Sequence, residues 1–211
     1  MKHVLLGGVL LGLFLSHFPS TGEWELILFQ TWQAVSNELR RLMKGGGGIK
    51  GTNTMHPILK SKMPKDKKAC FSRWVADIRL QKEEIHRVRM TAAGNFLEGT
   101  YTGKTSTETA NIETVKIHTN HIISTPGAKC CALDIHNMYL NTVLPTPEYM
   151  RIHVSMIQDD IRTEYGITDE YVDNKGFIYF EITKAIYGLI QSGVVFVLCY
   201  YFLEQSINLN G

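Results

Sequence analysis

At 211 residues, the chain is long enough for one domain with a sizeable core or for two small domains. Hydrophobic residues make up 44% of it and charged residues 20%, which excludes the composition of a disordered protein. A formal net charge of +2 and a pI near 8.3 exclude a domain that binds nucleic acid through its global charge, so any basic surface must be local.

The first 20 residues contain an apolar run with the length of a signal-peptide core. Lys2 and His3 precede this run, which covers residues 4–15. The run is too short to span a membrane comfortably, and the residues after it form no small-x-small cleavage site. Three interpretations therefore stay open: a secretory leader, a buried apolar segment or translated flanking sequence.

The four cysteines favour a reducing compartment. Cys70, Cys130, Cys131 and Cys199 include no pair with the two-residue gap typical of zinc ligands or redox dithiols. Free thiols are the norm inside cells. An intracellular protein is therefore favoured, although the signal-peptide-like start leaves the localisation open.

Apolar residues at helical spacing predict an amphipathic helix over residues 29–43. They step by three, four and three, at Trp32, Val35, Leu39 and Leu42. The four glycines at 45–48 should end this helix, because each glycine costs about 1 kcal/mol in a helix interior relative to alanine. A flexible turn is expected there.

The next segments predict short strands joined by turns. Residues 56–60 are the first strand candidate, and the polar, basic residues 62–68 are typical of a turn. Residues 73–80 alternate, so their apolar side chains would face one side of a strand and Arg73 the other. Residues 87–91 offer the next strand. The pattern predicts a half-buried hairpin with one charged face.

The second half of the chain mixes helical and strand patterns. A helix is expected over residues 109–124 with Thr109 as its cap, and strands over 129–135 and 177–182. Residues 194–203 are expected to form a buried helix. The acidic residues between the two strands are expected to lie on a solvated face: Asp159, Asp160, Glu164, Asp169, Glu170 and Asp173. Without strict alternation of strands and helices, an α+β fold is favoured.

An aspartate near the end of an apolar run is the clearest candidate for a catalytic residue. Asp134 is the carboxylate of the run at 129–135, and Tyr139 follows five positions later. A carboxylate at a strand end is a suitable ligand for Mg²⁺, which prefers carboxylate and phosphate oxygens. A cap or turn residue is the alternative interpretation of Asp134.

Residues 134–142 resemble the first carboxylate motif of copia-type retrotransposon reverse transcriptases, in which an aspartate is followed by an aromatic residue and then Leu-Asn. Other segments resemble the same family, in the order in which the family has them. They lie at residues 37–42, 49–54, 64–67, 75–79, 82–84, 87–91, 124–128, 148–152 and 184–191. The last of them has the pattern Lys-x-x-Tyr-Gly-Leu-x-Gln and ends at Gln191. Together the matches cover most of residues 30–195.

The resemblance implies a partial right-hand polymerase fold, with fingers and the first part of a palm, built from a mixed or antiparallel sheet packed with helices. Residues 1–25 would be an apolar leader or an unrelated N-terminal segment. Residues 26–211 would be a partial reverse transcriptase domain. Within it, the fingers would cover about 28–95 and 141–190, and the palm about 96–140 and 191–211.

The resemblance also implies a catalytic and metal-binding role for Asp134, with Mg²⁺ as the expected cofactor. Lys65 and Arg73 would hold the phosphates of an incoming deoxynucleoside triphosphate (dNTP), since arginine can bind them bidentately. Which of Lys65, Lys67 and Lys68 reaches the phosphates is left open. A solvated basic turn is the other interpretation of these lysines.

Two further residues would contact the sugar of the same dNTP. Tyr139 would lie beneath it, leaving no room for a 2′-hydroxyl, and so would select deoxynucleotides. The alternative is a core tyrosine. Gln191 would act as a hydrogen-bonding residue near the same sugar and base.

The chemistry of template-directed nucleotide addition needs two divalent ions. The family's second acidic motif, with two adjacent aspartates, is expected beyond Gln191, where 20 residues remain and none is aspartate. A truncated RNA-directed DNA polymerase (nucleotidyltransferase) that is not catalytic alone is therefore expected. Its partners would be an RNA or DNA template-primer, dNTP and a missing downstream polyprotein segment, with no clear membrane partner.

Two other functions stay open from the sequence. The first is a non-enzymatic nucleic-acid-binding remnant that uses Lys65, Lys67, Lys68 and Arg73, whose binding should fall steeply with salt. The second is a small secreted or membrane-associated protein, if the N-terminal leader is real. The polymerase interpretation favours the cytoplasm or a virus-like particle.

Overall fold

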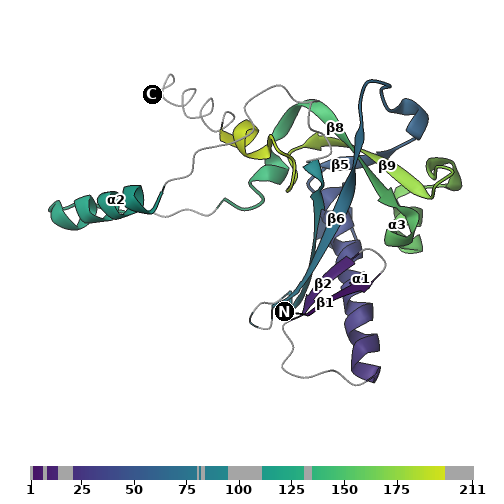
Figure 1. The fold of residues 1–211 in the computed structure, drawn as a ribbon, viewed down its shortest axis with the longest axis horizontal. Helices are drawn as coiled ribbons and strands as arrows, with labels where there is room; N and C mark the ends of the chain where they lie inside the picture. The colour runs from purple at the N-terminus through teal and green to yellow at the C-terminus, as the bar shows by residue number, and fades with distance from the viewer. Residues whose placement is uncertain are drawn as a thin grey trace.

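The computed structural model describes residues 2–6, 9–13, 21–79, 81, 84–94, 111–130 and 135–197. A mixed sheet of seven strands and the long helix α1 (Thr21–Leu42) make up most of it (Figure 1). The strands of this sheet are β1 (Lys2–Leu6), β2 (Val9–Leu13), β5 (Met55–Ile58), β6 (Ala69–Ile78), β7 (His86–Ala92), β8 (Val143–His153) and β9 (Phe177–Lys184). Two shorter helices are α2 (Ile112–Ser124) and α3 (Asp159–Tyr165). The expected α+β class is confirmed.

The long strand β6 joins the two halves of the sheet. The strand order is β1-β2-β6-β8-β9-β5, and β7 also pairs with β6. The first residues of β6 pair with β8, and the later ones pair with β2 and β7. β6 runs parallel to β2 and β8, whereas the other neighbouring strands are antiparallel. The sheet is therefore mixed, as expected.

Helix α1 buries the apolar face that the sequence predicts. Val35, Leu39 and Leu42 have no exposed surface, and Trp32 packs partly buried against the same core. Burying a leucine side chain contributes about 1.5 to 3 kcal/mol, so these positions hold the helix on the sheet. The helix begins at Thr21, before the predicted start at residue 29. The prediction missed these first turns because the apolar spacing on which it rested begins later in the sequence.

The four glycines after α1 form a tight hairpin between β3 (Gly45–Gly46) and β4 (Ile49–Lys50). Gly45 has a φ of +91°, and a Cβ at this position would lie 2.5 Å from the backbone nitrogen of Gly51. A side chain is excluded both by the left-handed backbone and by this close approach. The turn expected at these glycines is therefore a defined hairpin.

The predicted hairpin of residues 73–91 is confirmed as β6 and β7. Trp74 and Ala76 are buried on one face of β6, whereas Arg73, Val75 and Asp77 are exposed on the other. Residues of β7 face those of β6 in antiparallel register. The period of two in the sequence therefore identified the buried face correctly.

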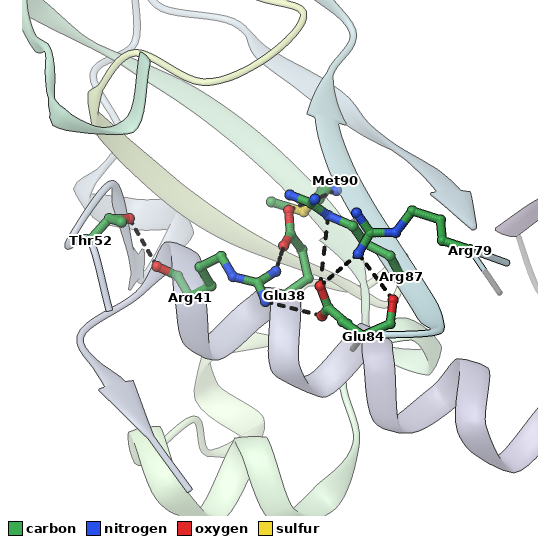
Figure 2. A network of polar contacts seen from close by, with 7 residues as sticks. All are labelled: Glu38, Arg41, Thr52, Arg79, Glu84, Arg87 and Met90. Carbon is green, nitrogen blue, oxygen red and sulfur yellow. Dashed lines mark hydrogen bonds and ion pairs between the residues drawn. The ribbon is translucent and has the colours of Figure 1, made fainter. Parts of the chain in front are cut away.

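A chain of ion pairs ties α1 to both arms of this hairpin (Figure 2). Glu38 is 3% exposed; it accepts hydrogen bonds from Arg41 (2.6 Å) and from the backbone N–H of Met90 (3.3 Å). Arg41 also donates to Glu84 (3.2 Å), which accepts from Arg79 as well (3.1 Å). Burial raises the pKa of Glu38, and the nearby Arg41 opposes this shift. Glu38 is thus a buried charge that depends on its partners.

The acidic stretch is a solvated face only in part: Asp159, Asp160, Asp169 and Glu170 are exposed, whereas Glu164 and Asp173 are partly buried. Asp160 and Glu164 of α3 accept hydrogen bonds from the buried Arg40 at 2.9 and 2.7 Å. The side chain of Asp173 is 5% exposed, and it accepts hydrogen bonds from four donors, among them the backbone N–H of Phe177. Burial opposes the ionisation of Asp173, but these donors outweigh it and hold its pKa below the usual range. The carboxylates therefore join elements of the fold.

Strand β8 was not expected as a strand. Pro145 and Pro147 lie inside it, and proline has no N–H for the sheet ladder. The register with β9 shifts between Val143 and Glu148, where the prolines lie. The sequence therefore carried a signal against a strand, which the regular pairing of residues 148–153 overrides.

Two other expectations need correction. Helix α2 begins at Ile112, and its cap is Asn111, whose side chain accepts a hydrogen bond from the N–H of Thr114, and not Thr109. Residues 129, 130 and 135 are not in a strand, and residues 131–134 lie outside the described residues. Of the buried helix expected at 194–203, residues 194–197 are helical and the rest lie outside the described residues.

Helix α2 projects away from the sheet (Figure 1). All but one of its residues are exposed, including Ile112, Ile117 and Ile123. Its apolar spacing therefore predicted the helix but not a buried face. In the part of the chain that the structure describes, no helix combines the length and the apolar character needed to cross a membrane.

Candidate functional site

The segment that follows β9, residues 185–192, holds Gln191 and contacts Tyr139, two of the five predicted site residues. The N–H of Ala185 donates to the carbonyl of Thr142 (2.7 Å), and the N–H of Ala92 donates to the carbonyl of Tyr187 (2.8 Å). Gly188 has a φ of +90°, and a Cβ there would lie 2.1 Å from the carbonyl oxygen of Ala92. Glycine is required at this position because the end of β7 approaches so closely.

Tyr139 contacts this segment through an aromatic pair. It lies in a short 3₁₀ turn (Tyr139–Asn141) and is half-buried. Its ring meets the ring of Tyr187 edge-on, with centroids 5.4 Å apart and planes at 84°. The guanidinium of Arg89 lies 5.5 Å from the centroid of Tyr187, within the range of a cation–π contact. Tyr187 therefore contacts both Tyr139 and Arg89.

Gln191 meets a buried carboxylate. It is 3% exposed, and its Nε2 donates to Oε1 of Glu148, which is 2% exposed, at 3.1 Å. Lys67 lies on the other side, with its Nζ 3.9 Å from Oε2 of Glu148. Burial raises the pKa of Glu148, while Lys67 and Gln191 act in the opposite direction. Glu148 therefore contacts both Lys67 of the basic turn and Gln191, the residue predicted to lie near the sugar.

The structure distinguishes between the lysines of the basic turn. Lys67 reaches Glu148, whereas Lys65 and Lys68 are exposed. Arg73 is also exposed, on the open face of β6, and among the described residues no contact joins its side chain to Gln191. Of the two predicted phosphate-binding residues, neither Lys65 nor Arg73 is therefore brought next to Gln191.

Asp134, the predicted catalytic and metal-binding residue, lies outside the described residues. The chain is described again from Ile135, and a turn at residues 136–138 leads into Tyr139. Among the residues that are described, no group of three or more His, Cys, Asp and Glu side chains could hold a metal ion.

Two residues of the site were given no role from the sequence, Glu148 and Tyr187. Both lie in segments that resemble the reverse transcriptase family, which was the available signal. Their roles come from contacts across the fold, since Glu148 and Gln191 are 43 positions apart. The ring of Tyr139 and the carboxylate of Glu148 thus contact residues 187–191, and Lys67 lies next to Glu148. No protein-family model, no curated protein and no solved structure matches this chain.

Proposed function

We propose that residues 26–211 are the fingers and the first part of the palm of an RNA-directed DNA polymerase of the copia-type retrotransposon class, and that they bind dNTP and template-primer. The observation that carries the proposal is that Tyr139 packs on Tyr187, while Gln191 of the same segment shares the buried Glu148 with Lys67. Tyr139, Lys67 and Gln191 come from distant parts of the sequence, each from a segment that resembles the family. A shared nucleotide site explains these contacts.

Each residue has a chemical role in this proposal. Lys67 neutralises a phosphate of the dNTP, since its ammonium group is partly exposed at the edge of the site. Tyr139 supports the sugar with a ring held by Tyr187. Gln191 is almost fully buried, so a direct hydrogen bond to the sugar requires a movement of its segment. In the present arrangement it instead orients Glu148.

Catalysis needs more carboxylates than these residues supply. Asp134 is the one acidic residue that matches a metal-binding position of the family, and a two-metal site draws on one or two carboxylates for each ion. Residues 192–211 contain no aspartate. A polypeptide of these 211 residues is therefore expected to bind dNTP without extending a primer.

The test is the affinity for a fluorescent dTTP in the presence of MgCl₂. Lys67→Ala is expected to weaken binding about tenfold, because a charge-assisted hydrogen bond to phosphate is lost. Tyr139→Ala is expected to weaken it and also to reduce the preference for dTTP over the ribonucleotide, since the sugar loses its support. Both affinities are read from fluorescence titrations, with circular dichroism to check the fold.

Lys62→Ala is the matched control for Lys67→Ala. Lys62 is an exposed lysine of the short 3₁₀ helix Lys60–Lys62 that precedes the same turn, and its replacement should leave the affinity unchanged. An equal loss in both variants would mean that general charge, and not this site, binds the nucleotide. Absence of dTTP binding by the unchanged protein would refute the proposal.

A second candidate function is nucleic-acid binding without a nucleotide site. The exposure of Lys65, Lys68 and Arg73 favours it, because exposed cations can reach the phosphates of a longer strand. In that case oligonucleotide affinity would fall steeply with salt, and replacing Arg73 would weaken it uniformly across sequences. Replacing Tyr139 would have little effect.

A further inference from the structure

Glu148 and Gln191 form a buried polar pair with more acceptors than donors. The amide of Gln191 donates to one oxygen of Glu148 at 3.1 Å. The other oxygen of Glu148 and the carbonyl oxygen of Gln191 accept no hydrogen bond from any residue in the described part of the chain. Both residues are more than nine-tenths buried, where an acceptor without a donor is costly.

One added proton changes this balance. A carboxyl group that carries a proton has an O–H donor as well as an acceptor, and it no longer holds a charge away from water. The ionised carboxylate is stabilised instead by a nearby cation and by water. Lys67 lies 3.9 Å from Oε2 of Glu148, beyond hydrogen-bonding distance, and its side chain reaches the surface. An ionised Glu148 therefore gains by moving away from Gln191 toward Lys67 and water.

Two titratable neighbours of Glu148, Cys70 and Tyr149, keep their protons through neutral pH. Cys70 of β6 lies in the same core, and burial raises its pKa to about 12. Tyr149, the next residue of β8, donates its hydroxyl hydrogen to Glu181 of β9, and burial raises its pKa to about 12. Two other carboxylates, Asp66 and Glu181, act on Tyr149, whereas Lys67 and Gln191 are the groups that oppose the raised pKa of Glu148.

We propose that Glu148 is a proton-operated latch, which holds residues 185–197 against β8 when it is protonated and releases them when it is ionised. The released segment carries Tyr187, which contacts Tyr139 and Arg89. Opening the latch therefore weakens the support of Tyr139 in the nucleotide site, while it frees Gln191 to reach the sugar. This consequence rests on the proposed function, but the latch itself does not.

The sign of the pH effect follows from the direction of the pKa shift. Burial raises the pKa of Glu148 in the closed form above its value in the open form. The closed form is therefore favoured at low pH, and its advantage is lost as the pH rises through the raised pKa. Acidic conditions should tighten the segment and alkaline conditions should loosen it.

Amide hydrogen exchange without nucleotide tests the latch. The N–H groups of Ser192 and Val195 are reporters, since they donate to the carbonyls of Leu189 and Gln191. After correction for intrinsic exchange, their protection should fall about tenfold between pH 5 and pH 8, the equivalent of one net hydrogen bond. Glu148→Gln should abolish this fall, because a neutral amide keeps the donor at every pH.

Two further variants make the test decisive. Glu181→Gln, a half-buried glutamate on β9 that pairs with Tyr149 and His56, is the matched control and should keep the fall in protection. Lys67→Met removes the cation that favours ionised Glu148, so the fall should move to higher pH. This second variant decides the matter if Glu148→Gln does not fold.

Equal protection of Ser192 and Val195 at both pH values in the unchanged protein would overturn the latch. A persistent fall in Glu148→Gln, or an unmoved transition in Lys67→Met, would overturn it as well. A pH-dependent segment in a protein that binds no dTTP would support the latch and refute the proposed function.

Discussion

Replacing Phe180 with alanine is expected to lower the free energy of unfolding by about 3 to 5 kcal/mol. Phe180 has no exposed surface and lies in the middle of β9, between Met150 of β8 and Pro57 of β5. The loss combines the burial energy of the ring with the cavity that the alanine leaves. Because single domains are stable by about 5 to 15 kcal/mol, the variant should be close to unfolding. Chemical denaturation followed by circular dichroism measures the change.

Phe29→Ala is the matched control for this substitution. Phe29 is 69% exposed on α1, so its replacement should change the stability by less than about 0.5 kcal/mol. Similar losses in the two variants would mean that the sheet between β5 and β8 is not the core of the fold.

Replacing Glu38 with alanine is expected to cost about 3 kcal/mol, although Glu38 is a charged residue. The substitution leaves the backbone N–H of Met90, which has no exposed surface, without its acceptor. It also removes one of the two carboxylates that pair with Arg41 (Figure 2). Buried polar groups that lose their partners are more costly than exposed ion pairs. Urea denaturation of both proteins measures the difference.

Glu25 provides the comparison on the same helix. It is exposed, so Glu25→Ala should leave the stability nearly unchanged. Glu38→Gln should lose less than Glu38→Ala, because the amide oxygen can still accept from Met90. If Glu25→Ala and Glu38→Ala were equally mild, the ion-pair chain between α1 and the β6–β7 hairpin would not support the fold.

The elements that the sequence predicted well are those with a local period. Leu39 and Leu42 repeat at helical spacing, and the alternation of Trp74 and Ala76 with charged neighbours marks a strand. In both elements the buried face follows from the backbone geometry alone. The helix over 112–124 was recognised in the same way, yet its apolar residues are exposed. The periodicity of a sequence thus predicts that a helix or strand forms, but it does not predict whether another element packs on its apolar face.

Features that depend on distant contacts could not be predicted. The partner of Asp160 is Arg40, 120 positions away, so a run of acidic residues looked like a solvated surface. The burial of Glu148 depends on Gln191 and on β9, and two prolines hide the strand that carries it. Lys67 and Lys65 are equivalent in the sequence, and only the fold brings one of them to Glu148.

Hydrogen exchange with and without dTTP and MgCl₂ tests the central claim most directly, namely that separate segments form one nucleotide site. We expect dTTP to slow exchange together in residues 65–68, 139–142 and 185–192, while helix α3, which contacts α1 through Arg40, stays unchanged. Unchanged exchange in all three segments at saturating dTTP would contradict it.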